Sequence, residues 1–218
     1  MWASNRGKTE NPTTRTRAAL CPGSATSAIP VPAAGAAVFP REGCSVADTI
    51  PDVIEPAALA DYFEVMTRAV FQAGVSWKQI ATPWDAYRKA FDNFDPVRVA
   101  RYDELDVERV LATPGVLRMP RKIRATIANA AAMLHADREY GKFATYLRSF
   151  PEYPALVKDI KRRFALMGDM NAWYFLFRVH EPVPHFDGWV RTIRGEHPRM
   201  REMVERARSM GRSSERLG

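Results

Sequence analysis

A basic segment followed by a short apolar turn with one glycine carries the clearest chemical signal in the sequence. The turn spans residues 164–168 and ends at Gly168, and Asp169 and Met170 then open a new helical pattern. The first amides of such a helix are unpaired and can bind phosphate, and a glycine lets the phosphate approach the backbone. The pattern predicts a helix-hairpin-helix that binds a DNA strand through Gly168 and Met170. An ordinary corner between two helices is the alternative, and Asp169 favours it, since a carboxylate at a helix start competes with phosphate.

Two groups of cations would add attraction to phosphate that does not depend on base sequence. The first group precedes the turn and comprises Lys158, Lys161, Arg162 and Arg163. The second group lies near residue 120 and comprises Arg118, Arg121 and Lys122. The DNA contacts that we predict from them are Lys161, Arg163, Arg118 and Lys122. For the second group, a solvated helix face or structural pairing is the alternative interpretation.

Helical periodicity predicts the elements that would position these side chains. An apolar stripe over residues 59–70 predicts a helix that begins after Pro56 and is closed by Gly74. The clearest helix, at 119–139, has Pro120 in its first turn. Other helices are predicted at about 76–91, after Asp95-Pro96, and at 106–112, 142–149, 154–163, 169–179, 185–194 and 198–210. No alternation typical of strands occurs, so the predicted fold class is all-α.

The composition indicates one folded domain with an appendage. The chain has 218 residues, of which 46% are hydrophobic and 26% are charged, as is usual for a folded protein. Residues 1–46 are rich in Ala, Pro, Ser, Thr and Gly and predict a disordered leader, with a transit peptide as the alternative. We predict a helical domain over 47–210 and a disordered tail over 211–218. No apolar run is long enough to span a membrane. Cys21 and Cys44 both fall in the leader, so they predict neither a disulfide framework nor a zinc cluster.

The charge is distributed unevenly along the chain. The formal net charge of +7 favours a polyanionic partner such as nucleic acid. Residues 51–190 carry 19 basic and 18 acidic side chains, whereas residues 191–218 carry 8 and 4. We therefore expect a nearly neutral core whose positive charge is local, followed by an Arg-rich segment.

An ordered series of motifs resembles the DNA-3-methyladenine glycosylase I family. The segment Phe71-Gln72-Ala73-Gly74-Val75-Ser76-Trp77 is similar to that family's Gln-Ala-Gly-Leu-Ser-Trp signature. Later landmarks of the family follow in order at 91–100, 106–111, 115–118 and 122–130, and residues 164–174 fall where the family has its hairpin. The resemblance covers about residues 60–190. It implies the helix-hairpin-helix glycosylase fold, an orthogonal helical bundle that flips an alkylated base out of DNA and excises it.

The sequence departs from this family at two places. The N-terminal Cys and Tyr-His-Asp motifs of the family's zinc site have no counterpart, and His180, His185 and His197 are left without cysteine partners. No metal and no other cofactor is therefore predicted. Ala69 stands where the resemblance places a base-contacting glutamate. We identify the chain as a divergent, zinc-less relative of the family.

The resemblance also suggests which residues would handle a base. Trp77 would offer a flipped base an aromatic face, worth roughly 0.5–2 kcal/mol for a cationic base; a core tryptophan is the alternative. Gln72 and Ser76 would contact the edge of the base, or else cap the helix ends around Gly74. Asp187 is the predicted catalytic residue, because many glycosylases of this fold have an aspartate near this distance from the hairpin glycine. It would stabilise the positively charged sugar and orient water. The alternatives are an N-terminal helix cap for Asp187 and a role for His185 as the acid or a phosphate contact.

Together these features predict a DNA glycosylase-like protein of base excision repair. It would hydrolyse the N-glycosidic bond of an alkylated purine such as 3-methyladenine in double-stranded DNA. It would not cut the strand, since no catalytic lysine motif accompanies the hairpin. We expect a monomer in the cytoplasm, associated with the nucleoid, with no membrane partner. The alternatives are a catalytically inactive helix-hairpin-helix DNA-binding protein and a helical interaction module with no nucleic-acid role.

Overall fold

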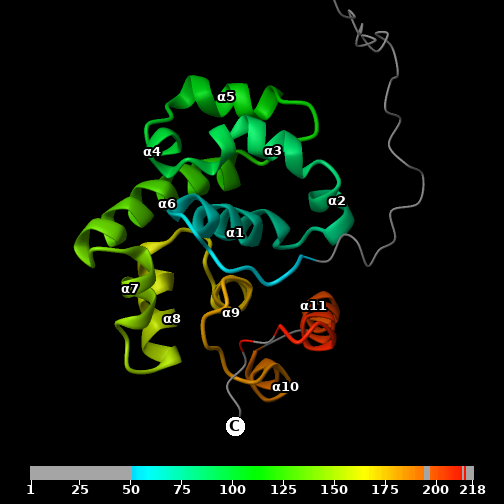
Figure 1. Cartoon of the computed structure of the whole chain (residues 1–218). Coiled ribbons are helices and arrows are strands. Elements are labelled where there is room, and N and C mark those ends of the chain that lie inside the picture. Colours follow the sequence, from blue (N-terminus) through cyan, green and yellow to red (C-terminus); the bar gives the residue numbers. More distant parts are fainter. Residues whose placement is uncertain (1–50, 194–196, 213, 215–218) are drawn as a thin grey trace, which may run out of the picture. The chain divides into compact units, whose positions relative to one another are not determined.

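The computed structural model describes residues 51–193, 197–212 and 214, and every regular element in these ranges is a helix (Figure 1). The predicted all-α class is confirmed. The predicted leader, 1–46, lies outside the described residues, and so does most of the predicted tail, 211–218. Among the described helices, none combines the length and the apolar character needed to cross a bilayer.

The helices follow one another closely along the chain. The first six α-helices are α1 (Leu59–Gln72), α2 (Trp77–Ala81), α3 (Trp84–Ala90), α4 (Pro96–Val99), α5 (Glu104–Ala112) and α6 (Pro120–Glu139). The next five are α7 (Phe143–Arg148), α8 (Tyr153–Arg163), α9 (Asp169–Arg178), α10 (Phe186–Trp189) and α11 (Pro198–Ser209). Two short 3-10 helices are η2 (Asp92–Phe94) and η3 (Val190–Thr192).

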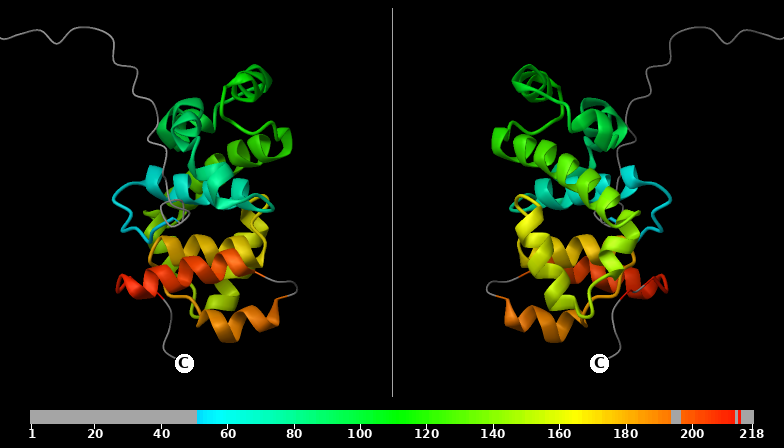
Figure 2. Two further views of the ribbon diagram at one scale, coloured as in Figure 1. Left: turned by 90° about the vertical axis from the view of Figure 1, so that its right-hand side faces the viewer. Right: turned by 90° about the vertical axis from the view of Figure 1, so that its left-hand side faces the viewer.

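Helix α1 is the element around which the others pack. It contacts α2, α4, α6 and α9, and Figure 2 displays these neighbours from two sides. Its apolar stripe buries Phe63, Met66 and Val70 completely, and each such side chain contributes about 1.5–3 kcal/mol. Gly74 has a φ of +78°, a conformation that favours glycine and ends the helix. The predicted helix end at Gly74 is confirmed.

The single helix predicted at 76–91 is wrong, because the chain forms two helices there. Helix α2 ends at Ala81 and α3 begins at Trp84, with Pro83 between them. Proline has no N–H to donate to a carbonyl one turn earlier, and Pro83 itself leaves helical geometry, with φ −92° and ψ 16°. Within α3, Trp84 stacks on Tyr87, with ring centroids 5.0 Å apart. Nε1 of Trp84 donates to Glu64 of α1 at 2.8 Å.

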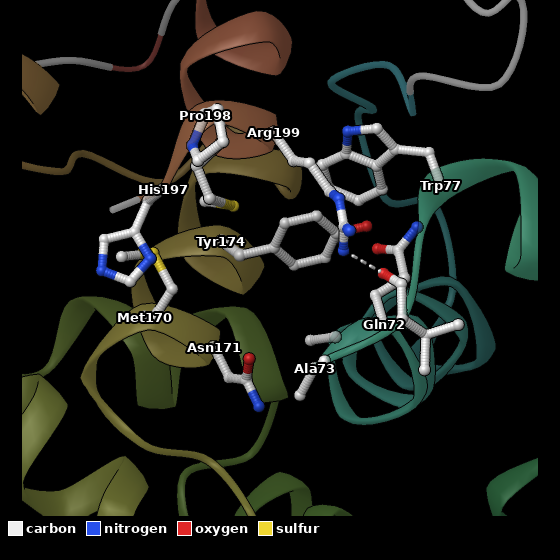
Figure 3. Close-up of a pocket in the computed structure, with 13 residues that line it drawn as sticks. Gln72, Ala73, Trp77, Met170, Asn171, Tyr174, His197, Pro198 and Arg199 are labelled. Carbon is white, nitrogen blue, oxygen red and sulfur yellow. Dashed lines mark hydrogen bonds between the residues drawn. The ribbon is translucent and has the colours of Figure 1, made fainter. Parts of the chain in front are cut away.

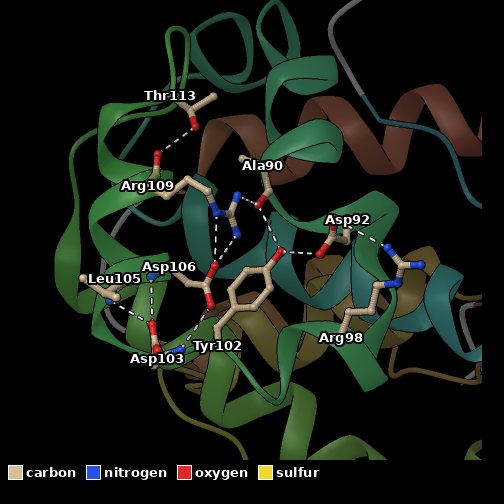
Figure 4. A network of polar contacts seen from close by, with 9 residues as sticks. All are labelled: Ala90, Asp92, Arg98, Tyr102, Asp103, Leu105, Asp106, Arg109 and Thr113. Atoms are coloured by element: carbon tan, nitrogen blue, oxygen red, sulfur yellow. Dashed lines mark hydrogen bonds and ion pairs between the residues drawn. The ribbon is translucent and has the colours of Figure 1, made fainter.

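A polar network fastens the segment after α3 to α5 (Figure 4). The single proton of the Tyr102 hydroxyl is shared between the Ala90 carbonyl at 3.2 Å and Asp92 at 3.0 Å, and Nη1 of Arg109 donates to the same carbonyl at 3.1 Å. Burial is the main reason why the pKa of Tyr102 is raised to about 12. The network stabilises η2, whose three residues all have positive φ, a costly conformation for residues other than glycine.

The C-terminal elements add to the same core. Helix α11 contributes four buried side chains to it, Met200, Met203, Val204 and Ala207. The helix predicted at 185–194 is instead a short α10 followed by η3. Asp187 of α10 binds Arg201 and Arg208 of α11 at 3.0 and 3.4 Å. These ion pairs fasten α10 to α11.

Candidate functional site

A cavity of about 480 Å³ opens where α1, α2, α9 and α11 meet (Figure 3). A cavity of this size falls within the range of small-ligand pockets. Helix α1, the loop after it and the start of α2 supply Ala69, Gln72, Ala73, Gly74, Val75 and Trp77. Helix α9 and the start of α11 supply Met170, Asn171, Tyr174, His197, Pro198, Arg199 and Met200. Two sequence-predicted residues for base binding, Trp77 and Gln72, are thus brought together, and Met170 lines the same cavity.

Two aromatic rings form one part of the wall. Trp77 stacks on Tyr174, with ring centroids 5.9 Å apart and an interplanar angle of 23°. The Tyr174 hydroxyl accepts a hydrogen bond from Nη1 of Arg178 at 2.6 Å, which fixes the orientation of its ring. Trp77 is 6% exposed, so it is a core residue and a lining residue at once.

Three buried polar atoms of this wall have no hydrogen-bond partner among the described residues. They are Oε1 and Nε2 of Gln72 and Nε1 of Trp77. An unpaired buried donor or acceptor costs about 1–3 kcal/mol, so a ligand that bonds to these atoms recovers that cost. The amide can donate and accept, whereas the indole only donates. Aromatic surface beside a few polar atoms suits a flat heteroaromatic ring.

The loop between α1 and α2 is held by two cations from distant parts of the chain. Nζ of Lys122 donates to the carbonyls of Phe71 at 2.9 Å and Ala73 at 2.8 Å. Nη1 of Arg199 donates to the Val75 carbonyl at 2.7 Å, as Figure 3 displays. Burial lowers the pKa of the Lys122 ammonium group. Lys122 therefore binds the last carbonyls of α1, the structural alternative to a DNA contact.

Ser76, which the sequence suggested as a base contact, caps α2. Its hydroxyl accepts from the N–H of Gln79 at 3.2 Å, and Oε1 of Gln79 accepts from the N–H of Ser76 at 3.2 Å. This reciprocal pair satisfies amides that a helix start leaves unpaired. Ser76 is not among the described residues that line the cavity. Its role in the structure is therefore that of a helix cap, the alternative to a base contact.

Two asparagines hold the turn that joins α8 to α9. Asn129 of α6 donates from Nδ2 to the Ala165 carbonyl at 3.1 Å and accepts at Oδ1 from the Ala165 N–H at 2.7 Å. Asn171 donates from Nδ2 to the Leu166 carbonyl at 2.8 Å. Leu166 has a φ of +59°, a backbone conformation that costs leucine energy. The asparagine bonds offset that cost and fix the shape of the turn.

Gly168 is the N-cap residue of α9 and has an ordinary φ of −70°. A Cβ atom placed on it would meet nothing within 4 Å. Neither the backbone conformation nor the neighbouring described residues therefore require glycine here. The open space beside the first amides of α9 suits an approaching anion.

Helix α6 supports both the loop at the cavity and the turn before α9. Lys122 and Asn129 are seven residues apart, or about two helical turns, so they lie on one face about 10 Å apart along the axis. Lys122 contacts the end of α1, and Asn129 contacts the turn. One helix thus holds both the loop at the cavity and the turn that leads into α9.

Several predicted DNA contacts are engaged in ion pairs. The Arg163 side chain is 15% exposed and binds Asp159 at 2.6 Å and Glu139 at 2.7 Å, which ties α8 to α6. We therefore correct its predicted role, because its guanidinium is committed to these carboxylates. Nζ of Lys161 lies 2.9 Å from both carboxylate oxygens of Asp169. The exposed cations that form no ion pair with the described residues include Arg118, Arg121 and Lys158.

Asp187, the predicted catalytic carboxylate, is not among the described residues that line the cavity. Its oxygens bind Arg201 and Arg208 of α11, and Nδ1 of His185 lies 3.9 Å away. It does not cap α10 either, since His185 occupies the N-cap position. We correct the prediction on this basis: the arginines of α11 neutralise Asp187, and the carboxylate joins two helices.

The described residues do not fit the zinc site of the family that the sequence resembles. Within 51–193, 197–212 and 214, no cluster of three or more His, Cys, Asp or Glu side chains could hold a metal ion. His180 is bound to Glu55. Cys21 and Cys44 lie outside the described residues. Ala69, at the position of the expected glutamate, is 2% exposed and lines the cavity.

Sequence reasoning missed Tyr174, Asn129 and Arg199. Tyr174 follows Met170 by one helical turn, so the two share a helix face, and this spacing was an available signal. Asn129 is a polar residue on the buried side of α6, 1% exposed, and an asparagine within an apolar stripe is a second signal. Arg199 gave no signal, because α11 alternates Arg and Glu as solvated helices do.

Comparison of the sequence with known proteins gives one consistent answer. The profile of the methyladenine glycosylase family matches residues 56–172. DNA-3-methyladenine glycosylase 1 of Escherichia coli (strain K12) is 39% identical over 88 residues, which are 40% of this chain and 47% of that protein. DNA-3-methyladenine glycosylase of Haemophilus influenzae is 32% identical over 89 residues, 41% of this chain and 48% of that protein. The chain thus spans about half the length of these relatives.

Solved structures give the same answer for the fold. A crystal structure of 3-methyladenine DNA glycosylase I matches with a TM-score of 0.50 and 29% identity over 58% of this chain and 81% of that one. The enzyme of Staphylococcus aureus, solved to explain 3-methyladenine recognition, matches with a TM-score of 0.54 and 23% identity. That match covers 62% of this chain and 82% of the S. aureus chain. The latter similarity establishes the shared fold.

Proposed function

Because this chain belongs to the methyladenine glycosylase family, we propose that it is a DNA glycosylase of base excision repair. It hydrolyses the N-glycosidic bond of alkylated purines such as 3-methyladenine in double-stranded DNA, after flipping the base out, and leaves an abasic site. The activity named for its relatives supports the reaction class. The chemistry of the cavity supports a base as the ligand.

The observation that carries the proposal is the wall formed by Gln72, Trp77 and Tyr174. It places stacked aromatic rings beside buried polar atoms that lack a partner among the described residues. A base flipped out of the duplex would stack on this surface and form the missing hydrogen bonds. Stacking of a base on an aromatic side chain is worth about 1–3 kcal/mol, which offsets part of the cost of unpairing it.

The first amides of α9 would hold the DNA strand. The open approach to Gly168 supports this role, and the exposed cations Lys158, Arg118 and Arg121 would add attraction. Because Met170 and Asn171 at the start of α9 line the cavity, a phosphate could bind at the hairpin while a nearby base enters the cavity. The protein would act as a monomer.

The reaction needs few catalytic groups when the base is already cationic. A purine alkylated on a ring nitrogen leaves as a neutral base: the bond to C1′ of the sugar breaks, its electron pair passes to the ring nitrogen, and water adds to C1′ and releases one proton to the solvent. None of the described lining residues is Asp or Glu, which is compatible with such a substrate. We assign no catalytic residue, and we expect no strand cleavage.

A second candidate function is damage recognition without base removal. It is favoured by Ala69 at the position of the family's glutamate and by the absence of any carboxylate among the described lining residues. Such a protein would bind abasic-site DNA with an affinity that falls as salt rises, and it would release no base.

The two candidates separate in a base-release experiment. Duplex DNA methylated with a simple alkylating agent is incubated with the full chain, and free bases are separated by chromatography. We expect release of 3-methyladenine, and we expect Trp77→Ala to slow it about tenfold or more, because the stacking surface is lost. Binding of abasic-site DNA with no release would leave only the recognition function.

The matched control is Trp77→Phe. It keeps a smaller aromatic face against Tyr174 and loses the five-membered ring with Nε1, so release should fall less than in Trp77→Ala. Thermal unfolding of both variants identifies a loss of folding. Equal release by Trp77→Ala and Trp77→Phe would show that the aromatic surface of residue 77 does not contribute to base release.

A further inference from the structure

The cavity wall includes a segment that lies beyond the family profile. That profile ends at residue 172, whereas Arg199 belongs to α11, Pro198–Ser209. Figure 3 displays the Arg199 side chain extending between Tyr174 and Gln72 toward the loop after α1. An element outside the matched region thus contributes to the site where the proposed function binds a base.

The guanidinium of Arg199 is fixed in place and can only donate. Its Nη1 donates to the Val75 carbonyl at 2.7 Å, and Val75 is itself 8% exposed. Arginine carries five N–H donors and no acceptor, so this bond leaves several donors at the edge of the cavity. The same bond occupies the Val75 carbonyl, an acceptor that the wall would otherwise offer to a ligand.

The other polar groups of the wall do not balance these donors. Nε1 of Trp77 is a donor only, and it is buried without a partner among the described residues. Asn171 and Gln72 have both a donor and an acceptor, and the Tyr174 hydroxyl and the His197 imidazole can also donate or accept. Since no Asp or Glu is among the described lining residues, no described lining side chain can only accept, whereas Arg199 and Trp77 can only donate.

We propose that Arg199 is a specificity-determining residue and selects a damaged base with a ring carbonyl over one with an exocyclic amino group. This inference rests on the proposed function and refines its substrate class. Oxopurines present O6 and N7 as adjacent acceptors, which match the fork of an arginine, whereas adenine presents a donor at N6. An amino group facing Arg199 would leave donors on both sides unpaired.

Free bases test this preference apart from catalysis. Binding of 3-methylhypoxanthine and 3-methyladenine, which differ mainly at C6, is measured by calorimetry on the full chain. We expect the oxopurine to bind about tenfold more tightly. Arg199→Ala should abolish that ratio, and Arg199→Lys, which keeps the charge but not the fork, should reduce it. Arg201→Ala removes an arginine of α11 that does not line the cavity, and it should leave the ratio unchanged.

Each outcome bears on the inference. Equal or tighter binding of 3-methyladenine, no binding of either base, or an unchanged ratio in Arg199→Ala would overturn it. Arg199→Lys keeps the test valid if Arg199→Ala does not fold. Base release from methylated DNA is measured in parallel. Release with 3-methyladenine preferred would overturn the inference and leave the proposed function standing. A carbonyl preference in binding without any release would support the inference and contradict the proposed catalysis.

Discussion

At the scale of single residues, Gln72 is placed for binding at the expense of stability. Both polar atoms of its amide are buried without a partner among the described residues, and an unpaired buried donor or acceptor costs the fold free energy. Functional sites commonly keep such groups unpaired until a ligand arrives.

Replacing Gln72 with leucine should therefore stabilise the fold and weaken base binding. Removing the unpaired amide should raise the free energy of unfolding by about 1 kcal/mol, as measured by urea denaturation. Release of base from methylated DNA should fall. Gln79→Leu is the matched control. It should lower the free energy of unfolding, because Gln79 is bonded in the capping box of α2. A loss of stability in Gln72→Leu would contradict this account.

Replacing Asp169 should change the affinity for DNA in a predictable direction. Its carboxylate binds Lys161 and stands at the start of α9, where it competes with phosphate. Asp169→Asn should raise the affinity for abasic-site duplex about threefold to tenfold, and the decline of affinity with salt should become steeper. Fluorescence anisotropy at several salt concentrations measures both. Glu108→Gln removes the same charge from the exposed surface of α5, and an equal gain there would attribute the effect to net charge.

Sequence reasoning was most successful where a residue's role depends on its neighbours along the chain. Gln72 and Trp77 come from one continuous motif, and both line the cavity. Asp187 was predicted from its distance to Gly168, but its partners Arg201 and Arg208 come from a later helix. Spacing along the chain carries no information on which cation a carboxylate meets in the fold.

At the scale of elements, α6 is the helix on which the site's geometry depends. Asn129→Ala should leave the N–H and carbonyl of Ala165 unpaired and lower the free energy of unfolding by about 2 kcal/mol. Amide hydrogen exchange at Ala165 should accelerate. Thr126→Ala is the control, because Thr126 is bonded within its own helix and its loss should not change that exchange rate. Unchanged protection in Asn129→Ala would mean that the turn is held without α6.

The ion pairs of Asp159 in α8 should make the fold sensitive to acid. Burial alone would raise the pKa of Asp159, but hydrogen bonds from Arg162, Arg163 and Tyr146 outweigh it and lower the pKa below its ordinary value. A lowered folded pKa stabilises the protein above the unfolded value of about 3.9, and the contribution is lost as the pH falls through the folded pKa. Asp159→Asn should thus be less stable than the unaltered protein at neutral pH, with the difference shrinking below about pH 4.

Urea denaturation at a series of pH values measures this difference. Asp85→Asn, at an exposed position of α3, serves as the control and should not reproduce the trend. If the difference between Asp159→Asn and the unaltered protein were the same in acid as at neutral pH, the ion pairs of Asp159 would not be the source of acid sensitivity.

Helix periodicity predicted most elements because each buries one apolar face, and burial repeats every turn. It failed at residues 76–91, where the apolar pattern continues across Pro83 although the backbone cannot. Local chemistry at a proline thus outweighed the pattern. Helix α11 was predicted with nearly its observed bounds, but its position over the cavity depends on packing between residues far apart in sequence.

At the scale of the whole molecule, stability should not depend on a metal ion. The described residues form no cluster of ligands. Treatment with EDTA should leave the midpoint of thermal unfolding unchanged, and the purified protein should contain zinc well below one equivalent. A fall in the midpoint on chelation, reversed by zinc, would contradict this prediction and would direct attention to Cys21 and Cys44, which lie outside the described residues.

Much of the positive charge counted in the sequence is paired with carboxylates in the fold. The sequence suggested a positive side formed by the two basic groups near residues 120 and 160. In the structure, Arg124 binds Glu104, and Arg162 and Arg163 bind Asp159, so much of that charge is neutralised. Composition counts charges but does not pair them, and the salt dependence of DNA binding should accordingly reflect only a few phosphate contacts.

The bond from Arg199 to Val75 joins residues 124 positions apart, and this has a consequence for how the protein is made. At a synthesis rate of about 5–20 residues per second, Val75 leaves the ribosome roughly 6–25 s before Arg199 does. During that interval the growing chain has α1 and α2 but lacks the α11 residues that complete the cavity wall. The Val75 carbonyl therefore gains its bond to Arg199 only after α11 has been made and has packed.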